Sequence, residues 1–210
     1  MLVSKCMQRI SLTRNQKAIL VGTLLGDGYL QKTGEKNARL RLEHGGKQKD
    51  YLIWKMHAFP RLFQAKPVHL SRVHPKTLAT YEYWRAQSSA SPVLGKWRTL
   101  FYPDGKKQIP KNLAEILTEP LALAVWYMDD GYYNPKDKNS FLYLGRVSRE
   151  EAECAQDMLT KNFELSVRVY DKKDKGFALY FSSEETKKLH KLIRQYVVLP
   201  TFAYKLGDIP

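Results

Sequence analysis

The sequence predicts an α+β fold of two pseudo-symmetric halves, each with the element order αββαββα and antiparallel sheets, packed through one helix from each half. Two similar segments, 20–29 and 123–132, each place an apolar run before Asp-Gly-Tyr. Their aspartates, Asp27 and Asp130, lie about half a chain apart in a protein of 210 residues. A similar series of strand-like and helix-like patterns follows each segment, which indicates an internal repeat. We expect the halves to be residues 1–108, with a basic N-terminal leader, and residues 109–210.

The first half begins with a helix and a hairpin. The apolar run at 20–25 predicts a buried helix. Gly28 is expected to end this helix, because glycine adopts the left-handed conformation without a Cβ penalty. After a turn at 32–37, Leu40 and Leu42 alternate with polar residues, which predicts a strand at 38–43 with one face in the core. The other elements predicted in this half are a helix at 48–63 and strands at 68–73 and 80–87.

The second half repeats this order. Its apolar run at 121–128 predicts another buried helix, which Gly131 is expected to end in the same way. Ser148 and Glu151 form a capping box that predicts the start of a helix. The other elements predicted here are a turn at 134–139, strands at 141–145, 167–170 and 177–181, helix 148–163, and a last helix that begins near residue 183.

The composition is that of a globular, basic protein. Apolar residues make up 43% and charged residues 27%, and 35 Lys and Arg against 21 Asp and Glu give a net charge of +14. This excess favours a polyanionic partner, either nucleic acid or an anionic membrane. No stretch approaches the roughly 20 apolar residues of a membrane helix. The basic residues lie mainly in turns rather than on an amphipathic helix, which disfavours the membrane.

The cysteines and the N-terminus bear on the cellular compartment. Cys6 and Cys154 are too few for an extracellular disulfide framework, so we expect reduced thiols in an intracellular protein. The histidines have no Cys partners at zinc spacing, which disfavours a structural zinc site. Lys5, Arg9 and Arg14, with no acid among them, are typical of a leader that docks on the body or on DNA, or of a transit peptide. A bacterial or archaeal cytoplasm and an organelle both remain open.

Lysines recur in all four expected hairpin turns, and the strands between them alternate apolar with polar side chains. Basic turns around two sheets suggest a rim that grips phosphates. Outward Arg, Tyr and Gln side chains suit a surface that reads base edges in a major groove, and an ordinary solvated face is the alternative. The turn residues are Lys32, Lys36, Lys76, Lys136, Lys138, Lys172, Lys173 and Lys175. The other residues expected on this surface are Arg39, Arg41, Glu43, Arg72, Tyr83, Arg85, Gln87, Arg146, Arg168, Tyr170 and Tyr180.

Three acids lie where a helix disfavours them. Asp27, Asp129 and Asp130 fall in the last turn of the two expected motif helices, at the negative end of the helix dipole, which costs about 0.3–1 kcal/mol per charge. A cation relieves this cost, and paired carboxylates near phosphates suit hard divalent ions such as Mg²⁺. If the two helices pack side by side, Asp27 and Asp130 meet beside one surface.

Small residues favour that packing. Gly22 and Gly26 lie four apart and form a flat stripe that allows two helix backbones to approach closely. The matching positions of the second segment are Val125 and Asp129. The packing is therefore expected to be asymmetric.

The two segments resemble the paired signature motifs of LAGLIDADG homing endonucleases, in the single-chain form with two motifs, and the resemblance extends from about residue 16 to 206. It implies that the two sheets form a DNA-binding saddle and that the chain is a monomeric, site-specific DNA endonuclease of intron homing. The implied reaction is metal-assisted phosphodiester hydrolysis, which makes a staggered double-strand break with 3′ overhangs. Two non-identical halves imply a long, asymmetric double-stranded DNA target.

The resemblance also implies which residues bind metal. The penultimate acid of each motif, Asp27 in the first and Asp130 in the second, is expected to hold Mg²⁺. Two or three ions are implied at this end of the helix pair, and Mn²⁺ is expected to substitute. Gly26 and Asp129 precede these acids and are assigned to the same metal site. For Asp129, a role at the helix end or in a hydrogen bond to nearby backbone is favoured over metal binding.

A catalytic lysine is implied in each half. Lys107 lies in a Lys-Gln-Ile-Pro stretch before the second motif, and Lys205 lies in a Tyr-Lys-Leu stretch near the end. Some members of the family also place an amide that positions water at the end of the first hairpin. Here Glu43 and Arg146 stand near that place instead, so this chain departs from the family in how it orients water.

The main alternative is an intron maturase, with intron RNA as a further partner, or a DNA-binding protein of the same fold without cleavage. The presence of both acids and both lysines argues against a loss of cleavage. A self-splicing intein is disfavoured, because Met1 is not a splice nucleophile and residues 207–210 lack His-Asn. A PD-(D/E)xK nuclease would combine Asp104 with the D-x-K run 171–173, and their separation and turn setting indicate a chance match.

Overall fold

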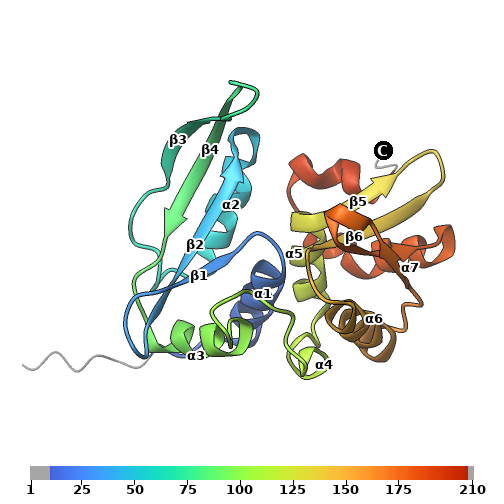
Figure 1. The fold of residues 1–210 in the computed structure, drawn as a ribbon, viewed down its shortest axis with the longest axis horizontal. Coiled ribbons are helices and arrows are strands. Elements are labelled where there is room, and N and C mark those ends of the chain that lie inside the picture. Colours follow the sequence, from blue (N-terminus) through green and yellow to red (C-terminus); the bar gives the residue numbers. More distant parts are fainter. Residues whose placement is uncertain (1–9, 208–210) are drawn as a thin grey trace, which may run out of the picture.

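The computed structural model describes residues 10–207, which fold into two four-stranded sheets on either side of a central pair of helices (Figure 1). Lys5 and Arg9 of the expected leader lie outside the described residues. The α-helices are α1 (Arg14–Leu25), α2 (Lys49–His57), α3 (Pro92–Phe101), α4 (Leu113–Ile116), α5 (Pro120–Asp130), α6 (Arg149–Phe163) and α7 (Ser183–Ile193). The 3₁₀ turns are η1 (Gly46–Gln48), η2 (Lys173–Lys175), η3 (Arg194–Tyr196) and η4 (Pro200–Leu206).

The two sheets have the same topology. Sheet A has the strand order β1-β2-β4-β3 and sheet B the order β5-β6-β8-β7, and every pairing is antiparallel. The strands of sheet A are β1 (Tyr29–Lys32), β2 (Ala38–Gly45), β3 (Val68–Val73) and β4 (Thr80–Gln87). Those of sheet B are β5 (Gly131–Asn134), β6 (Asn139–Gly145), β7 (Arg168–Asp171) and β8 (Phe177–Phe181). The predicted α+β fold with two pseudo-symmetric halves is confirmed.

Helices α1 and α5 pack along the glycine stripe. A Cβ added at Gly22 would lie 2.8 Å from Cβ of Val125 and would also clash with the carbonyl oxygen of Ala122. A Cβ added at Gly26 would lie 2.5 Å from Cβ of Asp129. The two backbones therefore touch only because these positions carry no side chain. Since larger residues of α5 fill the stripe on α1, the interface is asymmetric, as expected.

The glycines of the two Asp-Gly pairs act differently from the prediction. Gly131 has φ −76° and ψ 148°, and neither it nor Gly28 has a positive φ, so the left-handed helix end predicted for both is wrong. Glycine is required at both positions because nearby atoms leave no room for a side chain. A Cβ at Gly28 would lie 2.5 Å from Cγ2 of Thr23, and one at Gly131 would lie 2.6 Å from Cε2 of Tyr127.

Helix α2 is shorter than the predicted helix at 48–63. It ends at His57, because Pro60 disfavours the helical conformation at the preceding residue and cannot continue the hydrogen-bond ladder. Phe59 and Leu62 are nevertheless buried, so the apolar pattern that suggested a helix here belongs to a packed turn. By contrast, α6 begins at Arg149 after the predicted capping box of Ser148 and Glu151.

Each half is stabilised by its own hydrophobic core. One core is built around Leu40, Leu52 and Phe101 with the apolar face of sheet A, and the other around Leu142, Met158 and Leu179 with that of sheet B. Within the described residues, no helix has the length and apolar character needed to span a membrane.

Candidate active site at the paired helix ends

Asp27 and Asp130 lie at the adjacent C-terminal ends of α1 and α5. Asp27 follows the cap of α1 and Asp130 is the last residue of α5. Burial, with the neighbouring Asp27 and Asp129 carboxylates, raises the pKa of Asp130 to about 7, against the lowering effect of Lys107 and Lys205. Burial, and then Asp129, likewise raises the pKa of Asp27. The two helix ends thus gather carboxylates that repel each other, which is the electrostatic setting of a cation site.

Asp129 faces inward and is fully paired. Its two carboxylate oxygens lie 2.7 and 2.8 Å from Nζ of Lys55, and both side chains are 0% exposed. Oδ2 also accepts a hydrogen bond of 3.1 Å from the backbone N–H of Asp27. The Lys55 ammonium lies 4.4 Å from the ring centre of Tyr51. Asp129 therefore has the backbone hydrogen bond expected of it, together with a buried ion pair that ties α2 to both motif helices.

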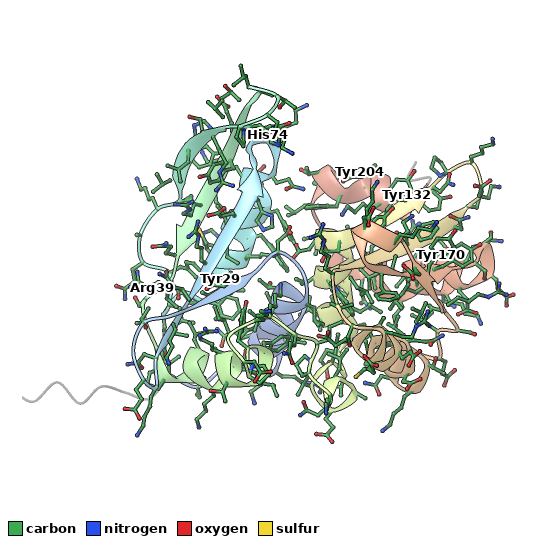
Figure 2. The ribbon with its side chains drawn as sticks, in the orientation of Figure 1. Tyr29, Arg39, His74, Tyr132, Tyr170 and Tyr204 are labelled. Carbon is green, nitrogen blue, oxygen red and sulfur yellow. The ribbon has the colours of Figure 1, made fainter. Side chains whose placement is uncertain are left out.

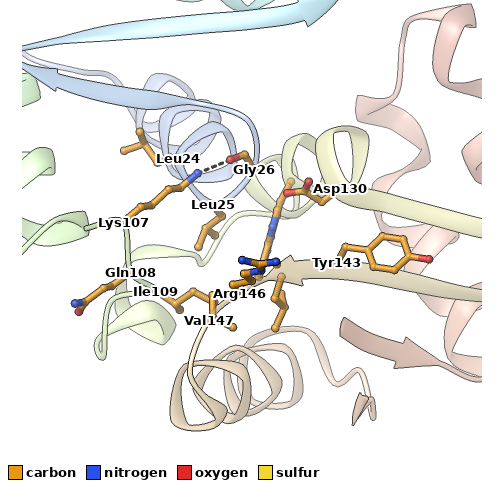
Figure 3. A pocket seen from close by; sticks show the side chains of 13 residues that line it. Leu24, Leu25, Gly26, Lys107, Gln108, Ile109, Asp130, Tyr143, Arg146 and Val147 are labelled. Atoms are coloured by element: carbon orange, nitrogen blue, oxygen red, sulfur yellow. Dashed lines mark hydrogen bonds between the residues drawn. The ribbon is translucent and has the colours of Figure 1, made fainter. Parts of the chain in front are cut away.

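The two predicted lysines bind the carbonyl groups at the helix ends. Lys107 donates to the carbonyl oxygen of Gly26 (Figure 3) and, at 3.2 Å, to that of Gly28. Lys205 donates to the carbonyl oxygens of Met128 at 2.7 Å and Asp129 at 3.2 Å. A cation here is favoured by the helix dipole and satisfies orphan carbonyls. Burial lowers the pKa of both lysines, and the nearby aspartates oppose this effect.

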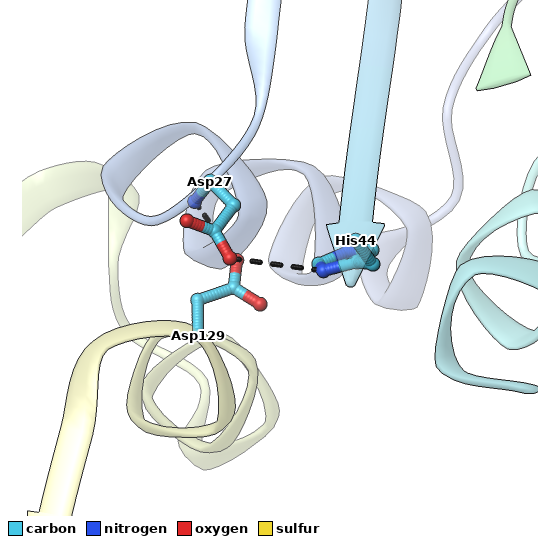
Figure 4. A group of neighbouring side chains, drawn as sticks. All are labelled: Asp27, His44 and Asp129. Atoms are coloured by element: carbon cyan, nitrogen blue, oxygen red, sulfur yellow. Dashed lines mark hydrogen bonds and ion pairs between the residues drawn. The ribbon is translucent and has the colours of Figure 1, made fainter. Parts of the chain in front are cut away.

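His44 joins the site from β2 and was not predicted. One ligand atom from each of Asp27, His44 and Asp129 lies within 4.8 Å of the others (Figure 4). Burial, with the Lys55 charge, lowers the pKa of His44 to about 3, so its imidazole is neutral. The sequence held a signal, because position 44 continues the buried series 38, 40 and 42 of the strand and a histidine there is a polar residue in a core-facing place.

Lys55 was also missed. It lies on the buried face of α2 with Tyr51 and Leu52. A lysine within an apolar stripe predicts a buried partner of opposite charge, but only the tertiary structure identifies that partner as Asp129, 74 positions later.

A cavity of about 350 Å³ opens beside Asp130 (Figure 3). Lys107, Arg146 and Tyr143 line it together with the end of α1. Arg146 donates to the carbonyl oxygen of Asp174 at 3.3 Å. The carboxylates of Asp27 and Asp130, whose pKa values are raised by burial and by the neighbouring acids, suit a hard divalent cation.

The predicted surface residues of the first half share one face of sheet A. In the strand register, Arg41 is paired with Gln87, Glu43 with Arg85, and Gly45 with Tyr83. Arg72 lies opposite Tyr81 on the same face, and Arg39, which is labelled in Figure 2, lies opposite Gln31. This face is polar and rich in arginine, as expected.

Glu43 is enclosed by two arginines of this face. Arg41 pairs with its carboxylate, and Nε of Arg85 lies 2.5 Å from its Oε1. Partial burial tends to raise the pKa of Glu43, but the hydrogen bonds from these arginines hold it below its usual value. Glu43 therefore orients two arginines on the sheet.

The matching face of sheet B is aromatic. Tyr132, Phe141, Tyr180 and Arg168 form one row across its four strands. Tyr143 and Tyr170 lie in the next row, and Tyr132 and Tyr170 are half-exposed (Figure 2). The predicted Arg168, Tyr170 and Tyr180 lie on this face, but Phe141 occupies the place of Arg41 and Tyr143 that of Glu43, so the face is less polar than that of sheet A.

All the lysines expected at the hairpin tips lie in turns except Lys32, which is the last residue of β1. Lys172 lies back over the aromatic face, with its ammonium 4.9 Å from the ring centre of Phe141 and 5.5 Å from those of Tyr143 and Tyr170. The others at or beside the tips are Lys32, Lys36, Lys76, Lys136, Lys138, Lys173 and Lys175. These positions outline both sheet faces with positive charge.

Known proteins share this arrangement. The solved structure of the homing endonuclease I-WcaI bound to its DNA recognition sequence matches with a TM-score of 0.87 and 26% identity, over 96% of this chain and 90% of that one. The probable intron-encoded endonuclease 1 of Wickerhamomyces canadensis is 28% identical over 95% of this chain and 87% of its own length.

A second kind of relative is longer. Protein RecA of Mycolicibacterium flavescens is 30% identical over 93% of this chain but only 47% of its own length, so the chain spans about half the length of this relative. The pattern of the LAGLIDADG DNA endonuclease family matches residues 17–189. With two signature motifs at the ends of packed helices and two saddle-forming sheets, the chain belongs to the LAGLIDADG DNA endonuclease family.

Proposed function

We propose that this chain makes a staggered double-strand break with 3′ overhangs at a long, asymmetric DNA target. The observation that carries the proposal is the convergence of Asp27 and Asp130, with raised pKa values, at the ends of α1 and α5 between two basic-rimmed sheets. Both reaction centres meet at one helix pair, so the two cuts fall close together across the minor groove. We further propose residues 1–108 and 109–210 as the two functional halves.

The charges of the site explain why a metal is needed. Three carboxylates, from Asp27, Asp129 and Asp130, face three ammonium groups, from Lys55, Lys107 and Lys205. When all three acids are ionised, these charges cancel, and the site then has no net charge to neutralise the two phosphates of the substrate. Asp27 and Asp130 would hold Mg²⁺, as two or three ions for which Mn²⁺ would substitute, and the metal would supply Lewis-acid stabilisation of the phosphate and a lower pKa for the attacking water.

The lysines act on the geometry and charge of the site. Lys107 and Lys205 fix the carbonyl groups of Gly26 and Asp129, which holds the backbone beside each catalytic acid in place. Their ammonium groups stabilise negative charge that develops on the phosphates. Asp129 orients the backbone N–H of Asp27 and thereby positions that carboxylate.

Mutation of the two acids tests the proposal. Cleavage sites are first selected from a randomised DNA library with Mg²⁺, and a plasmid with the selected site is then the substrate. Asp27→Asn or Asp130→Asn should reduce cleavage at least 100-fold, while binding measured by mobility shift persists, and EDTA should have the same effect on the native protein. Cleavage by either variant at the native rate would refute the metal assignment.

A basic cavity favours a second function, binding of intron RNA as a maturase. The cavity of about 510 Å³ lies against α7 and β5, and no carboxylate lines it. Tyr133 lines it, whereas Tyr132 lies on the DNA-facing side of the same strand, so this cavity opens away from the proposed DNA surface. Its cationic residues, which suit a phosphodiester backbone, are Lys138, Lys187, Lys191 and Arg194.

The two functions can be separated on α7. The variant Lys187→Glu with Lys191→Glu should weaken binding to the transcript that carries the gene at least 10-fold, while DNA cleavage is unchanged. Equal RNA binding by the native chain and this variant would contradict the proposal that the cavity binds intron RNA.

A further inference from the structure

His44 distinguishes the two reaction centres. Tyr29 pairs with Arg41 in the first hairpin, and the equivalent Tyr132 pairs with Phe141 in the second. His44 pairs with Trp84 in sheet A, and the corresponding place in sheet B, opposite Phe177, is held by Gly145, because a bulge inserts Leu144 after Tyr143. Leu144 and Gly145 both line the cavity beside Asp130, whereas His44 lies beside Asp27. An imidazole is therefore present at the first centre, and neither residue at its place in the second has a metal-binding side chain.

The contacts of His44 are incomplete. Its side chain is 1% exposed, and its Nδ1 lies 3.7 Å from Oδ2 of Asp27, which is too long for a hydrogen bond. Its Nε2 is buried and has no partner among the described residues. The ring packs on Tyr51 at 4.9 Å between centres, which fixes its direction. A buried polar side chain without a hydrogen bond is unfavourable by about 1–3 kcal/mol, so packing alone is a poor reason for a histidine here.

The separation of the two atoms suits a shared ion. Atoms about 2.1 Å from one cation lie roughly 3–4 Å apart, depending on the angle between the bonds. The distance of 3.7 Å between Nδ1 of His44 and Oδ2 of Asp27 falls in this range. Asp129, the third member of the cluster, is a poor ligand because Lys55 binds both of its oxygens.

We propose that His44 and Asp27 together bind one divalent cation at the first centre, a nitrogen–oxygen pair that the second centre lacks. This inference rests on the proposed endonuclease function and adds to it. Because imidazole favours transition metals over Mg²⁺, the first centre selects Mn²⁺ more strongly than the second. The two DNA strands are then cut by chemically different sites, so their rates respond differently to the metal.

Metal binding without DNA is the first test. Mn²⁺ binding to the full chain is measured by electron paramagnetic resonance for the native protein, His44→Leu, His44→Asn and the control His57→Leu, which removes an exposed imidazole from the end of α2. His44→Leu should weaken one class of Mn²⁺ site at least 10-fold, and His57→Leu should change none. Thermal unfolding without metal should be unchanged or higher for His44→Leu. Unchanged Mn²⁺ binding in both His44 variants would overturn the proposal.

Strand-resolved cleavage is the second test. Each strand of the selected target carries its own fluorophore, and both rates are measured in Mg²⁺ and in Mn²⁺. His44→Leu should slow one strand at least 10-fold in Mn²⁺ and the other less than 2-fold, so that nicked DNA accumulates. Equal slowing of both strands would overturn the assignment of His44 to one centre. Failure of the native chain to cut either strand would instead refute the proposed function, which separates the two outcomes.

Discussion

Replacement of Lys55 by Met is the sharpest test of how the site is held. Met fills nearly the same volume, but it leaves the Asp129 carboxylate, whose side chain is 0% exposed, without its ion-pair partner. The remaining hydrogen bond from the Asp27 N–H does not compensate a buried charge. Removal of one member of a buried ion pair costs about 3–5 kcal/mol, which is a large part of the roughly 5–15 kcal/mol stability of a protein.

The double variant separates this effect from a loss of packing. Lys55→Met with Asp129→Asn removes both charges and keeps an acceptor for the Asp27 N–H, so its stability should return to within about 1–2 kcal/mol of the native protein. Urea unfolding at pH 7.5 with EDTA measures all four proteins of the cycle. Lys55→Met alone should lower the melting temperature by roughly 6–20 °C. A single variant within about 1 kcal/mol of native, or a double variant no more stable than Lys55→Met, would refute the argument.

Two other predictions concern stability. Gly22→Ala should destabilise the chain by more than about 1–3 kcal/mol in the same urea assay, because its Cβ would lie 2.8 Å from Cβ of Val125. The control Gly34→Ala, whose Cβ would meet nothing nearer than 4.0 Å, should be neutral or slightly stabilising. Equal effects of the two substitutions would contradict the close helix packing. Burial lowers the pKa of His190 from 6.5 to about 4, so the unfolded chain binds the extra proton first as the pH falls, and the native stability should decline between about pH 6.5 and 4. His190→Gln should escape up to about 3 kcal/mol of this loss, and identical pH profiles of the two proteins would show that His190 does not contribute.

Local sequence patterns, each only a few residues long, were sufficient to predict the order of helices and strands. The apolar runs, the Asp-Gly pairs and the Ser148 capping box are local signals, and α5 and α6 lie where they indicated. The helix predicted across Pro60 failed, because its apolar residues are buried by a turn rather than by a helix face. The short helix α4 left no comparable signal, since its four residues are too few to show a helical period.

The candidate site was only partly accessible from sequence. Asp27 and Asp130 could be paired because they occupy the same place in two copies of one motif. Lys55 and His44 could not be assigned to the site in this way, since each lies in only one half. Each belongs to the site through a long-range contact, Lys55 with Asp129 and His44 with Asp27. An internal repeat predicts the site residues that its two copies share, but it gives no information about the residues by which the copies differ.

Those differences bear directly on the target. The face of sheet A presents Arg39, Arg41 and Arg85, and the face of sheet B presents an aromatic row in which Phe141 replaces Arg41. Arginine pairs with guanine in the major groove, whereas apolar rings contact the methyl group of thymine. If DNA binds across both faces as proposed, we expect unlike half-sites, with guanine favoured over sheet A and thymine over sheet B. Since Gly22 and Gly26 meet larger residues of α5 rather than each other, the halves are not interchangeable across their interface, and we expect the proposed DNA target to bind in one orientation.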